Sequence, residues 1–348
     1  MPSLPDGSGT APAASTPPAA PAAPAPSAAP ATLAAPDAPA PRVIAVVVTY
    51  NRRDLLLEAL AAVQAQTRPA DAVIVVDNAS TDGTAAAVRR QYPSVQLAEL
   101  ASNTGGAGGF ACGMALALDH SADLVWLMDD DTVPEPGALR ALLDARERYP
   151  AYPSRPPALL ASRVVWTDGR AHPMNTPRAK PFAGRAEREA AAATGCRPIR
   201  SASFVSILVD AGVSRERGLP QADYFLWNDD FEFTTRVLRG NVGLLCPASI
   251  VVHKTAAFGS TDSDPGQRFF YEVRNKIWTL RARAPLAPGE RMLYGGSTLR
   301  RWARTFAKSR DRRVLGQCLV KGAVAGVRTS PRPTSEVLAS AGLKSPVP

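Results

Sequence analysis

Three adjacent carboxylates, Asp129, Asp130 and Asp131, directly follow the apolar run at residues 124–128. Such neighbours repel one another unless a cation or solvent neutralises them. In a turn at a strand end, the alternate members Asp129 and Asp131 can point the same way. Mg²⁺ and Mn²⁺ prefer oxygen ligands and bind phosphates at the same time. An isolated triplet would favour a solvated turn that caps the next helix, whereas further polar clusters favour a metal and diphosphate site.

Three such clusters occur earlier in the chain, each after a predicted strand: Thr49-Tyr50-Asn51-Arg52, Asp77-Asn78 and Asn103-Thr104-Gly105-Gly106. Loops at the carboxyl ends of parallel strands face one crevice, so these clusters and the triplet can converge on one ligand. Glycines at a helix start let a backbone approach a ligand, although glycine clusters are commonly only loops. Asp77 suits a hydrogen bond to a nucleobase and a turn equally well. The glycines do not fit the dinucleotide-binding pattern of a dehydrogenase.

A second acidic segment, Trp227 to Glu232, precedes a predicted helix. An aromatic ring beside carboxylates suits a sugar, because the ring stacks on the apolar sugar face and a carboxylate accepts a hydroxyl proton. A helix cap is the alternative, and the two roles are compatible because a cap can hold a base rigidly. His253 follows an apolar strand and is either structural or the third ligand of an Asp/Asp/His metal site.

Strand-like and helix-like patterns alternate from residue 43 to about 165. Repeated β-α units predict a mainly parallel sheet with right-handed crossovers, flanked by helices and binding ligands at the carboxyl ends of its strands. Residues from about 150 to 200 are rich in Pro and Arg and predict loops around a strand at 159–166. Further strands are predicted at 203–210 and, as a pair around Pro247, at 242–252. The pattern after residue 267 is mainly helical and basic.

The two ends of the chain differ from this pattern. Residues 1–41 are almost entirely Ala, Pro, Ser and Thr and predict a disordered tail, and we expect a second one over 329–348. Neither a signal peptide nor the ~18 apolar residues needed to span a bilayer are evident, which indicates a soluble or peripherally attached protein. The four cysteines are scattered and predict reduced thiols.

The formal net charge of +9 has much of its excess in residues 283–328. This basic block suits an anionic membrane surface at least as well as nucleic acid. The apolar residues interspersed there, Leu293, Leu299, Trp302 and Phe306, could lie on the inner leaflet of a membrane. An ordinary basic packing helix explains the same stretch equally well.

Three motifs resemble, in the same order, the inverting family 2 glycosyltransferases with the GT-A fold: Val46–Arg52, Val76–Thr84 and Asp129–Asp131. The resemblance covers roughly residues 42–282. It implies an α/β GT-A domain over that range with a helical extension at 283–328. Four further segments are similar to the actinobacterial galactofuranosyltransferases of cell-wall galactan assembly, and more to the initiating enzyme than to the polymerising one: Asn103–Met114, Trp227–Arg236, His253–Thr255 and Tyr271–Lys276.

The resemblance implies a role for each matching residue. A UDP-sugar donor would contact Thr49, Asn51, Arg52, Asp77, Asn103, Gly105, Gly106, Asp129 and Asp130. Mn²⁺ or Mg²⁺ would be bound by Asp129, Asp131 and His253. Asp230 would be the general base, with Asp229 as its less favoured substitute. The acceptor would contact Trp227, Asn228, Arg274 and Asn275.

The implied activity is transfer of galactofuranose from UDP-galactofuranose to a rhamnosyl-GlcNAc-diphosphoryl-polyprenol in cell-wall galactan synthesis. The protein would then be cytoplasmic and peripheral at the inner face of the cell membrane, without a nucleic-acid partner. A rhamnosyltransferase on the same fold is the first alternative, and a non-catalytic nucleotide-sugar-binding protein the second. A nucleotidyltransferase would lack an evident basic loop after its first strand. The oligomeric state is left open.

Overall fold

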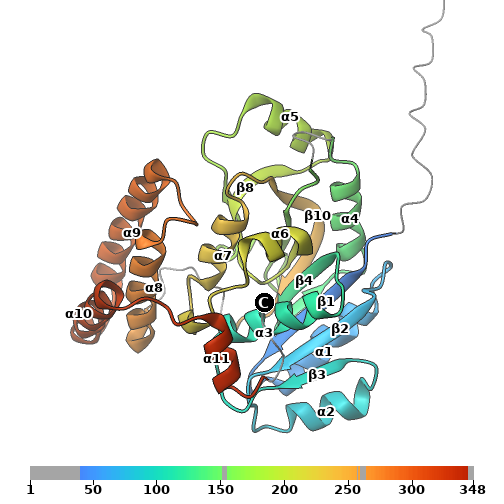
Figure 1. Ribbon diagram of the computed structural model, residues 1–348, viewed down its shortest axis with the longest axis horizontal. Helices are drawn as coiled ribbons and strands as arrows, with labels where there is room; N and C mark the ends of the chain where they lie inside the picture. Colours follow the sequence, from blue (N-terminus) through green and yellow to red (C-terminus); the bar gives the residue numbers. More distant parts are fainter. Residues whose placement is uncertain (1–39, 151–154, 257, 259–263, 344–348) are drawn as a thin grey trace, which may run out of the picture. The chain divides into compact units, whose positions relative to one another are not determined.

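The computed structural model describes residues 40–150, 155–256, 258 and 264–343 (Figure 1). Apart from its last two residues, the tail predicted for residues 1–41 lies outside the described residues, as do residues 344–348 of the tail predicted for the carboxyl end.

Four parallel strands form the first half of the central sheet, in the order β3-β2-β1-β4. They are β1 (Val43–Thr49), β2 (Ala72–Asp77), β3 (Gln96–Glu99) and β4 (Leu124–Asp129). Every residue of β1 is buried, as the β-branched run predicts for a strand covered on both faces. The connecting helices are α1 (Arg53–Gln64), α2 (Thr84–Gln91) and α3 (Gly105–Asp119). The predicted parallel β-α arrangement is therefore confirmed for this half.

The other strands make the sheet mixed, because β9 runs antiparallel to both β4 and β6. They are β5 (Thr132–Pro134), β6 (Leu159–Val165), β7 (Arg178–Ala179), β8 (Arg197–Ser201), β9 (Ile207–Asp210) and β10 (Gly243–His253). The prediction of two strands around Pro247 is wrong, since β10 is one strand with a register shift between Cys246 and Ile250. Proline lacks a donor and is accommodated at such an irregularity, so here it interrupts the hydrogen bonding without ending the strand.

Successive residues of β1 point to opposite faces of the sheet and enter two apolar layers. Ile44 and Val46 pack on the side of α3, whereas Val43 and Val47 pack on the side of α1 and of α4 (Ala138–Glu147). Helix α3 lies close to the sheet. A Cβ atom added at Gly113 would overlap Val46 Cγ1, so the absence of a side chain at Gly113 permits this approach. Nearer the start of α3, a Cβ atom at Gly109 would overlap Val48 Cγ1, so this part of the helix lies against the carboxyl end of β1.

The carboxyl-terminal part is helical, which agrees with the extension predicted at 283–328. After α5 (Arg185–Ala193), α6 (Ala211–Arg217) and α7 (Asp229–Val237) come α8 (Phe269–Arg281), α9 (Pro288–Lys308) and α10 (Arg312–Arg328). A separate apolar cluster, with Phe269, Val273 and Leu315 at its centre, joins α8 to α10. Within the described residues, no helix is both long and apolar enough to cross a bilayer.

The disordered tail predicted for 329–348 is wrong for helix α11 (Thr334–Ser340). Val337 and Leu338 are buried in the apolar layer that also contains α3. The Ala101 N–H donates to the Ala341 carbonyl at 2.9 Å, which ties the end of α11 to the loop after β3. The helix is short and its burial depends on residues far away in the sequence, so the local pattern did not reveal it.

Candidate active site

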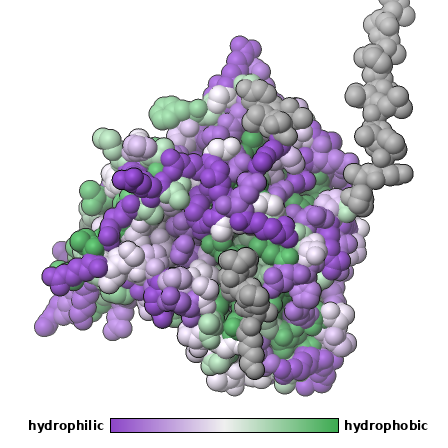
Figure 2. Space-filling model, viewed as in Figure 1, coloured by the Kyte–Doolittle hydropathy of each residue, from purple (hydrophilic) through white to green (hydrophobic). Residues whose placement is uncertain are grey.

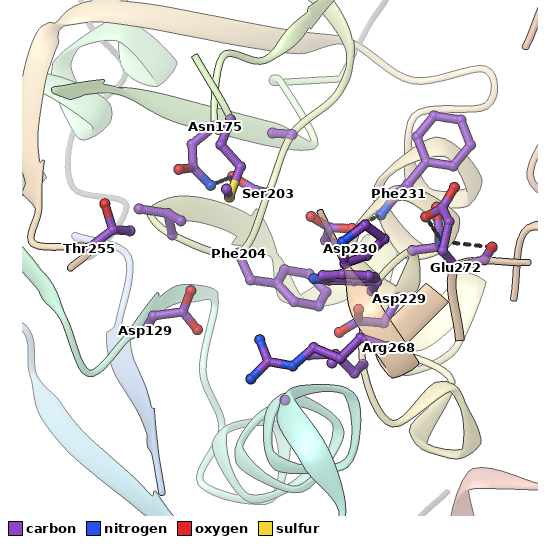
Figure 3. A pocket seen from close by; sticks show the side chains of 18 of the residues that line it. Asp129, Asn175, Ser203, Phe204, Asp229, Asp230, Phe231, Thr255, Arg268 and Glu272 are labelled. Carbon is purple, nitrogen blue, oxygen red and sulfur yellow. Dashed lines mark hydrogen bonds between the residues drawn. The ribbon is translucent and has the colours of Figure 1, made fainter. Parts of the chain in front are cut away.

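A cavity of about 720 Å³ lies at the carboxyl ends of the strands, and helices α8 and α9 contribute to its wall (Figure 3). Two sets of acidic residues line it. One set is the triplet after β4, and the other is the pair Asp229 and Asp230 at the start of α7. The structure therefore brings together the two acidic motifs that are about 100 residues apart in the sequence. His253, at the end of β10, lines the same cavity.

The polar cluster after β1 contacts the acidic triplet directly. Thr49 Oγ1 donates to Asp130 Oδ2 at 2.8 Å. Arg52 Nη1 lies 3.2 Å from Asp130 Oδ1 and 2.7 Å from Asp131 Oδ2. The predicted convergence of these two strand ends is confirmed, and Arg52 balances part of the negative charge.

Asp129, Asp131 and His253 could together hold a metal ion, because one ligand atom from each lies within 4.8 Å of the others. The short strand β5 turns back after the triplet and pairs with β10, so that His253 stands opposite Thr132. Asp131 Oδ1 is buried without a hydrogen bond, although His253 Nε2 lies 2.9 Å away. A carboxylate and a histidine whose ligand atoms lie close together in a buried place fit a divalent cation.

Burial and mutual repulsion perturb the carboxyl groups of the triplet. Burial and, after it, the neighbouring Asp131 charge together raise the pKa of Asp129 to about 7. Burial also raises the pKa of Asp130 to about 6, against the opposing effect of Arg52. At Asp131 the effect of burial is outweighed by His253 and Arg52, and its pKa is lowered. The site thus holds more buried carboxylate than its cations neutralise, which also fits a metal ion.

His253 is oriented by a residue that was not predicted. Its Nδ1 lies 2.9 Å from Asn175 Oδ1, and Asn175 Nδ2 donates to Ser203 Oγ at 3.2 Å. If Nδ1 carries the proton for Asn175, Nε2 presents its lone pair toward Asp129 and Asp131. Asn175 and Ser203 lie in or beside the Pro- and Arg-rich stretch that we expected to form loops, and no local pattern there indicates a role at the site.

Asp229 and Asp230 differ in their electrostatic surroundings. Burial raises the pKa of Asp229 well above its ordinary value, and the charges of Asp230 and Asp129 add to this shift. Burial also raises the pKa of Asp230, but Lys276 and Arg178 oppose the shift. Because a general base must be ionised to accept a proton, these surroundings favour Asp230 over Asp229.

Several predicted donor residues use their side chains to shape their own loop or to connect two strand-end loops, and they do not line the cavity. Asn51 Oδ1 accepts from Thr81 N at 2.7 Å, and Asp77 Oδ1 accepts from Ser80 N at 2.9 Å. Asn103 Oδ1 accepts from Gly105 N at 2.7 Å. These bonds shape the loops after β1, β2 and β3, and donor contact by these residues stays a prediction.

The two glycines at the start of α3 that were predicted to contact the donor differ in their surroundings. Gly105 has a φ of +70°, and a Cβ atom there would overlap the Phe225 carbonyl oxygen. The close approach that Gly105 permits is therefore to Phe225 and not to a ligand. Gly106 lines the cavity and would have no neighbour within 4 Å of an added Cβ atom, so it leaves space for a ligand.

Direct acceptor contact by Arg274 and Asn275 disagrees with their placement. Neither side chain lines the cavity, and Asn275 is fully buried. Trp227 and Asn228 do line the cavity, and their contact with an acceptor stays a prediction. Arg274 and Asn275 lie on α8 and were predicted from a sequence motif. A motif does not show whether a side chain of this helix points into the cavity or away from it.

Comparison with known proteins agrees with this geometry. The family model described as glycosyl transferase family 2 matches residues 44–208. Galactofuranosyltransferase GlfT1 of Mycobacterium tuberculosis is 31% identical over 277 residues, which cover 74% of this chain and 86% of that protein. The N-acetylglucosaminyl-diphospho-decaprenol L-rhamnosyltransferase of the same organism is 28% identical over 248 residues, or 63% of this chain and 78% of that protein.

Among solved structures, S. aureus TarS 1–349 in complex with UDP-GlcNAc is similar with a TM-score of 0.56. The sequence identity is 14%, and the match covers 86% of this chain and 84% of that one. At this identity the likeness concerns the fold, which is the GT-A fold that the sequence predicted.

Proposed function

The chain belongs to glycosyl transferase family 2, and we propose that within this family it is an inverting galactofuranosyltransferase. The donor is UDP-galactofuranose and the acceptor a rhamnosyl-GlcNAc-diphosphoryl-polyprenol of cell-wall galactan synthesis. The choice of donor is supported by the 31% identity to GlfT1 over most of both chains. The chemistry is supported by one observation, namely that Asp129, Asp131 and His253 share a cavity with Asp230.

In the proposed reaction, an acceptor hydroxyl oxygen attacks the anomeric carbon of the donor sugar. A carbon–oxygen bond forms on one face while the bond to the diphosphate breaks on the other. Asp230 takes the hydroxyl proton, and UDP leaves with the bonding electron pair. Asp129, Asp131 and His253 would hold Mn²⁺ or Mg²⁺, which supplies charge stabilisation for the leaving diphosphate when bound.

Other side chains of the cavity suit an anionic donor. Asp130 is held by Thr49 and Arg52 and is positioned to orient the donor sugar. The Arg268 side chain forms no ion pair or hydrogen bond with any described residue, and Figure 3 shows it directed toward the part of the cavity where Asp129 lies. A guanidinium at this place can bind a diphosphate oxygen.

A rhamnosyltransferase is the alternative that a specific observation favours, namely the 28% identity to the rhamnosyltransferase of M. tuberculosis. The donor pocket would decide between these two activities. A non-catalytic binding protein is disfavoured because the base and the three metal-binding side chains are all present.

The donor is tested by offering the purified protein UDP-galactofuranose, UDP-galactopyranose and dTDP-rhamnose with a short rhamnosyl-GlcNAc lipid analogue. Transfer is measured by mass spectrometry of the product. Of the three donors, we expect only UDP-galactofuranose to be used. Transfer from dTDP-rhamnose to a GlcNAc-diphosphoryl lipid would establish the alternative. Donor binding without turnover of any sugar would indicate a binding protein.

The outer faces of α9 and α10 support action at a membrane surface. Met292 and Leu299 on α9 are 81% and 65% exposed, and Val320 and Val327 on α10 are 63% and 60% exposed. Arginines and lysines are interspersed with them on both helices. Figure 2 shows apolar and hydrophilic residues intermixed over this part of the protein. We propose that this surface lies on the anionic inner leaflet, where a lipid-linked acceptor resides.

The prediction of which apolar residues are exposed on this surface was only partly correct. Leu293 and Leu299 are exposed, but Trp302 and Phe306 pack against Phe269 with ring centroids 5.9 and 5.7 Å away. Basic residues lie on both the buried and the exposed face of α9, so the sequence does not distinguish the two faces. Only the packing of α9 on α8 shows which apolar residues are buried.

The membrane proposal is tested by liposome flotation with vesicles of neutral and of anionic lipid. The wild type should float with anionic vesicles, and less so at high salt because surface charges are screened. The double variant M292E/L299E should lose flotation. Phe182, which is 99% exposed outside this surface, provides the matched control variant F182E, which should float as the wild type does. Absence of the wild type from both vesicle fractions would remove the proposal.

A further inference from the structure

The residues that precede the two aspartates of α7, Tyr224 to Asn228, have an uncommon backbone conformation; we name this segment the base loop. Phe225, Trp227 and Asn228 have φ angles of +64°, +65° and +65°. Residues other than glycine rarely occupy this region, because the Cβ atom is crowded there. Such a conformation persists only where surrounding contacts hold it. The place of Asp230 therefore depends on what contacts the base loop.

Helix α8 contacts the base loop through Asn275, whose side chain is completely buried. Asn275 Nδ2 donates to the carbonyl oxygens of Tyr224 at 2.9 Å, Leu226 at 2.9 Å and Trp227 at 2.8 Å. Asn275 Oδ1 accepts from Arg274 Nε at 2.9 Å, which orients the amide with its N–H groups toward the loop. One side chain thus binds most of the carbonyl groups of the strained segment.

Arg274 strengthens the same contact from the neighbouring position on α8. Its Nη2 donates to the carbonyl oxygens of Asp223 at 2.8 Å and Tyr224 at 3.2 Å. Its guanidinium lies 4.2 Å from the centre of the Trp278 ring, which limits its movement. Arg274 and Asn275 therefore act as one unit on the start of the base loop.

The other side of the base loop rests on the start of α3. The Phe225 carbonyl oxygen accepts from Ala107 N at 3.3 Å, and it lies where a Cβ atom of Gly105 would be. At the end of the loop, Asn228 Nδ2 donates to Glu272 Oε2 at 2.8 Å. The base loop is consequently held between α3 and α8, and the last of these contacts is made by Asn228, two residues before Asp230.

Glu272 extends this connection to the carboxyl-terminal helices. Its Oε1 accepts from Trp302 Nε1 at 3.1 Å and forms an ion pair with Arg301, both on α9. The carboxylate is buried and receives donors from the base loop and from α9. The helical extension is therefore part of the framework that holds the loop.

We propose that Asn275 is a positioning residue for the transfer reaction, which holds the base loop so that Asp230 faces the acceptor hydroxyl. This inference rests on the proposed role of Asp230 as the base. Asn275 does not line the cavity, so it acts on the reaction only through the loop. It should govern turnover and leave the binding of UDP unchanged, because the triplet and Arg52 do not touch it.

The test is a double-mutant cycle between N275A and D230N. N275A should lower kcat about 10²-fold, since a displacement of about 1 Å at a reacting group can cost that much. The dissociation constant of UDP with Mn²⁺, measured by calorimetry, should stay within about twofold. If Asn275 acts through Asp230, the double variant should turn over within about threefold of D230N alone, because the two losses then share one cause.

Two further variants control the experiment. N241A also removes an asparagine amide that donates to a carbonyl, that of Val237 at 2.7 Å, outside the base loop; it should leave kcat within about twofold of the wild type. R274K tests the same unit if N275A does not fold, and we expect about a tenfold loss of kcat with the same non-additivity.

Independent losses that multiply in the double variant would overturn the inference, and so would a kcat of N275A near that of the wild type. A parallel loss of UDP affinity in N275A would also overturn it, because the residue would then be a general structural support. Near-normal turnover of D230N would instead refute the proposed base, and with it the positioning role.

Discussion

Replacing Asp230 with asparagine should lower kcat by about 10²–10⁴-fold, the range that a positioned general base typically contributes. Asparagine keeps the shape of the side chain and can still accept the Phe231 N–H, which donates to Asp230 Oδ1 at 2.6 Å. It cannot take a proton from the acceptor. The binding of UDP and Mn²⁺, measured by calorimetry, should be unchanged because Asp230 is not among the three side chains that would hold the metal.

The pH dependence provides a second readout of the same prediction. Burial raises the pKa of Asp230, although Lys276 and Arg178 oppose this shift. The base is active only when deprotonated, so kcat should be high above that raised pKa and fall as the pH decreases through it. The D230N variant should lack this acidic limb of the profile.

The companion variant D229N distinguishes the two aspartates. Burial keeps the pKa of Asp229 well above the ordinary range, and the neighbouring carboxylates Asp230 and Asp129 add to this shift. We expect D229N to lose less turnover than D230N and to retain the acidic limb. A larger loss in D229N, or near-normal turnover in D230N with intact UDP binding, would contradict the assignment of the base.

Replacing Asp131 with alanine should lower turnover roughly 10³-fold, because several kcal/mol of charge stabilisation depend on the metal and each ~1.4 kcal/mol is a factor of ten. Asp131 is the most constrained of the three side chains that would hold the metal, since Arg52 contacts Oδ2 and His253 contacts Oδ1. Its removal also leaves Arg52 with one partner fewer. Titration of Mn²⁺ by electron paramagnetic resonance should show weakened binding, apart from any effect on activity.

The matched control is D264N, since Asp264 is an exposed carboxylate that lines the same cavity outside the metal-binding set. Its Oδ2 accepts from Ser309 Oγ at 2.9 Å, and the variant should keep the Mn²⁺ affinity of the wild type. A chelator should abolish transfer by the wild type and leave residual transfer by D131A unaffected. Transfer by the wild type that resists the chelator would contradict the metal role.

The acidic triplet shows how far local sequence information reaches. A β-branched or apolar run followed by polar residues marks the end of a strand, and the ends of adjacent parallel strands share an edge. From this rule alone, contacts between the cluster after β1 and the triplet after β4 are expected, and Thr49 and Arg52 make them. That rule does not apply to Asp229 and Asp230, which begin helix α7, and the structure shows them lining the same cavity.

Side-chain direction at longer range could not be read in the same way. Asn275 and Arg274 belong to a recognisable motif, but whether α8 turns them toward the cavity or toward the base loop depends on how α8 packs against α10 and the rest of the domain. Similarly, Asn175 reaches His253 from a segment without regular periodicity. The different surroundings of Gly105 and Gly106 also depend on tertiary structure, because only the folded chain places Phe225 against Gly105.

The amino-acid sequence by itself determined the α/β architecture of the first half and the strand-end position of the polar clusters. These follow from periodicity and residue chemistry, which act over a few residues. Only the tertiary structure decided which partner each side chain has, that β10 is one strand and that α11 is ordered. Each of these depends on burial against distant residues, and the free energy of such burial has no local signature.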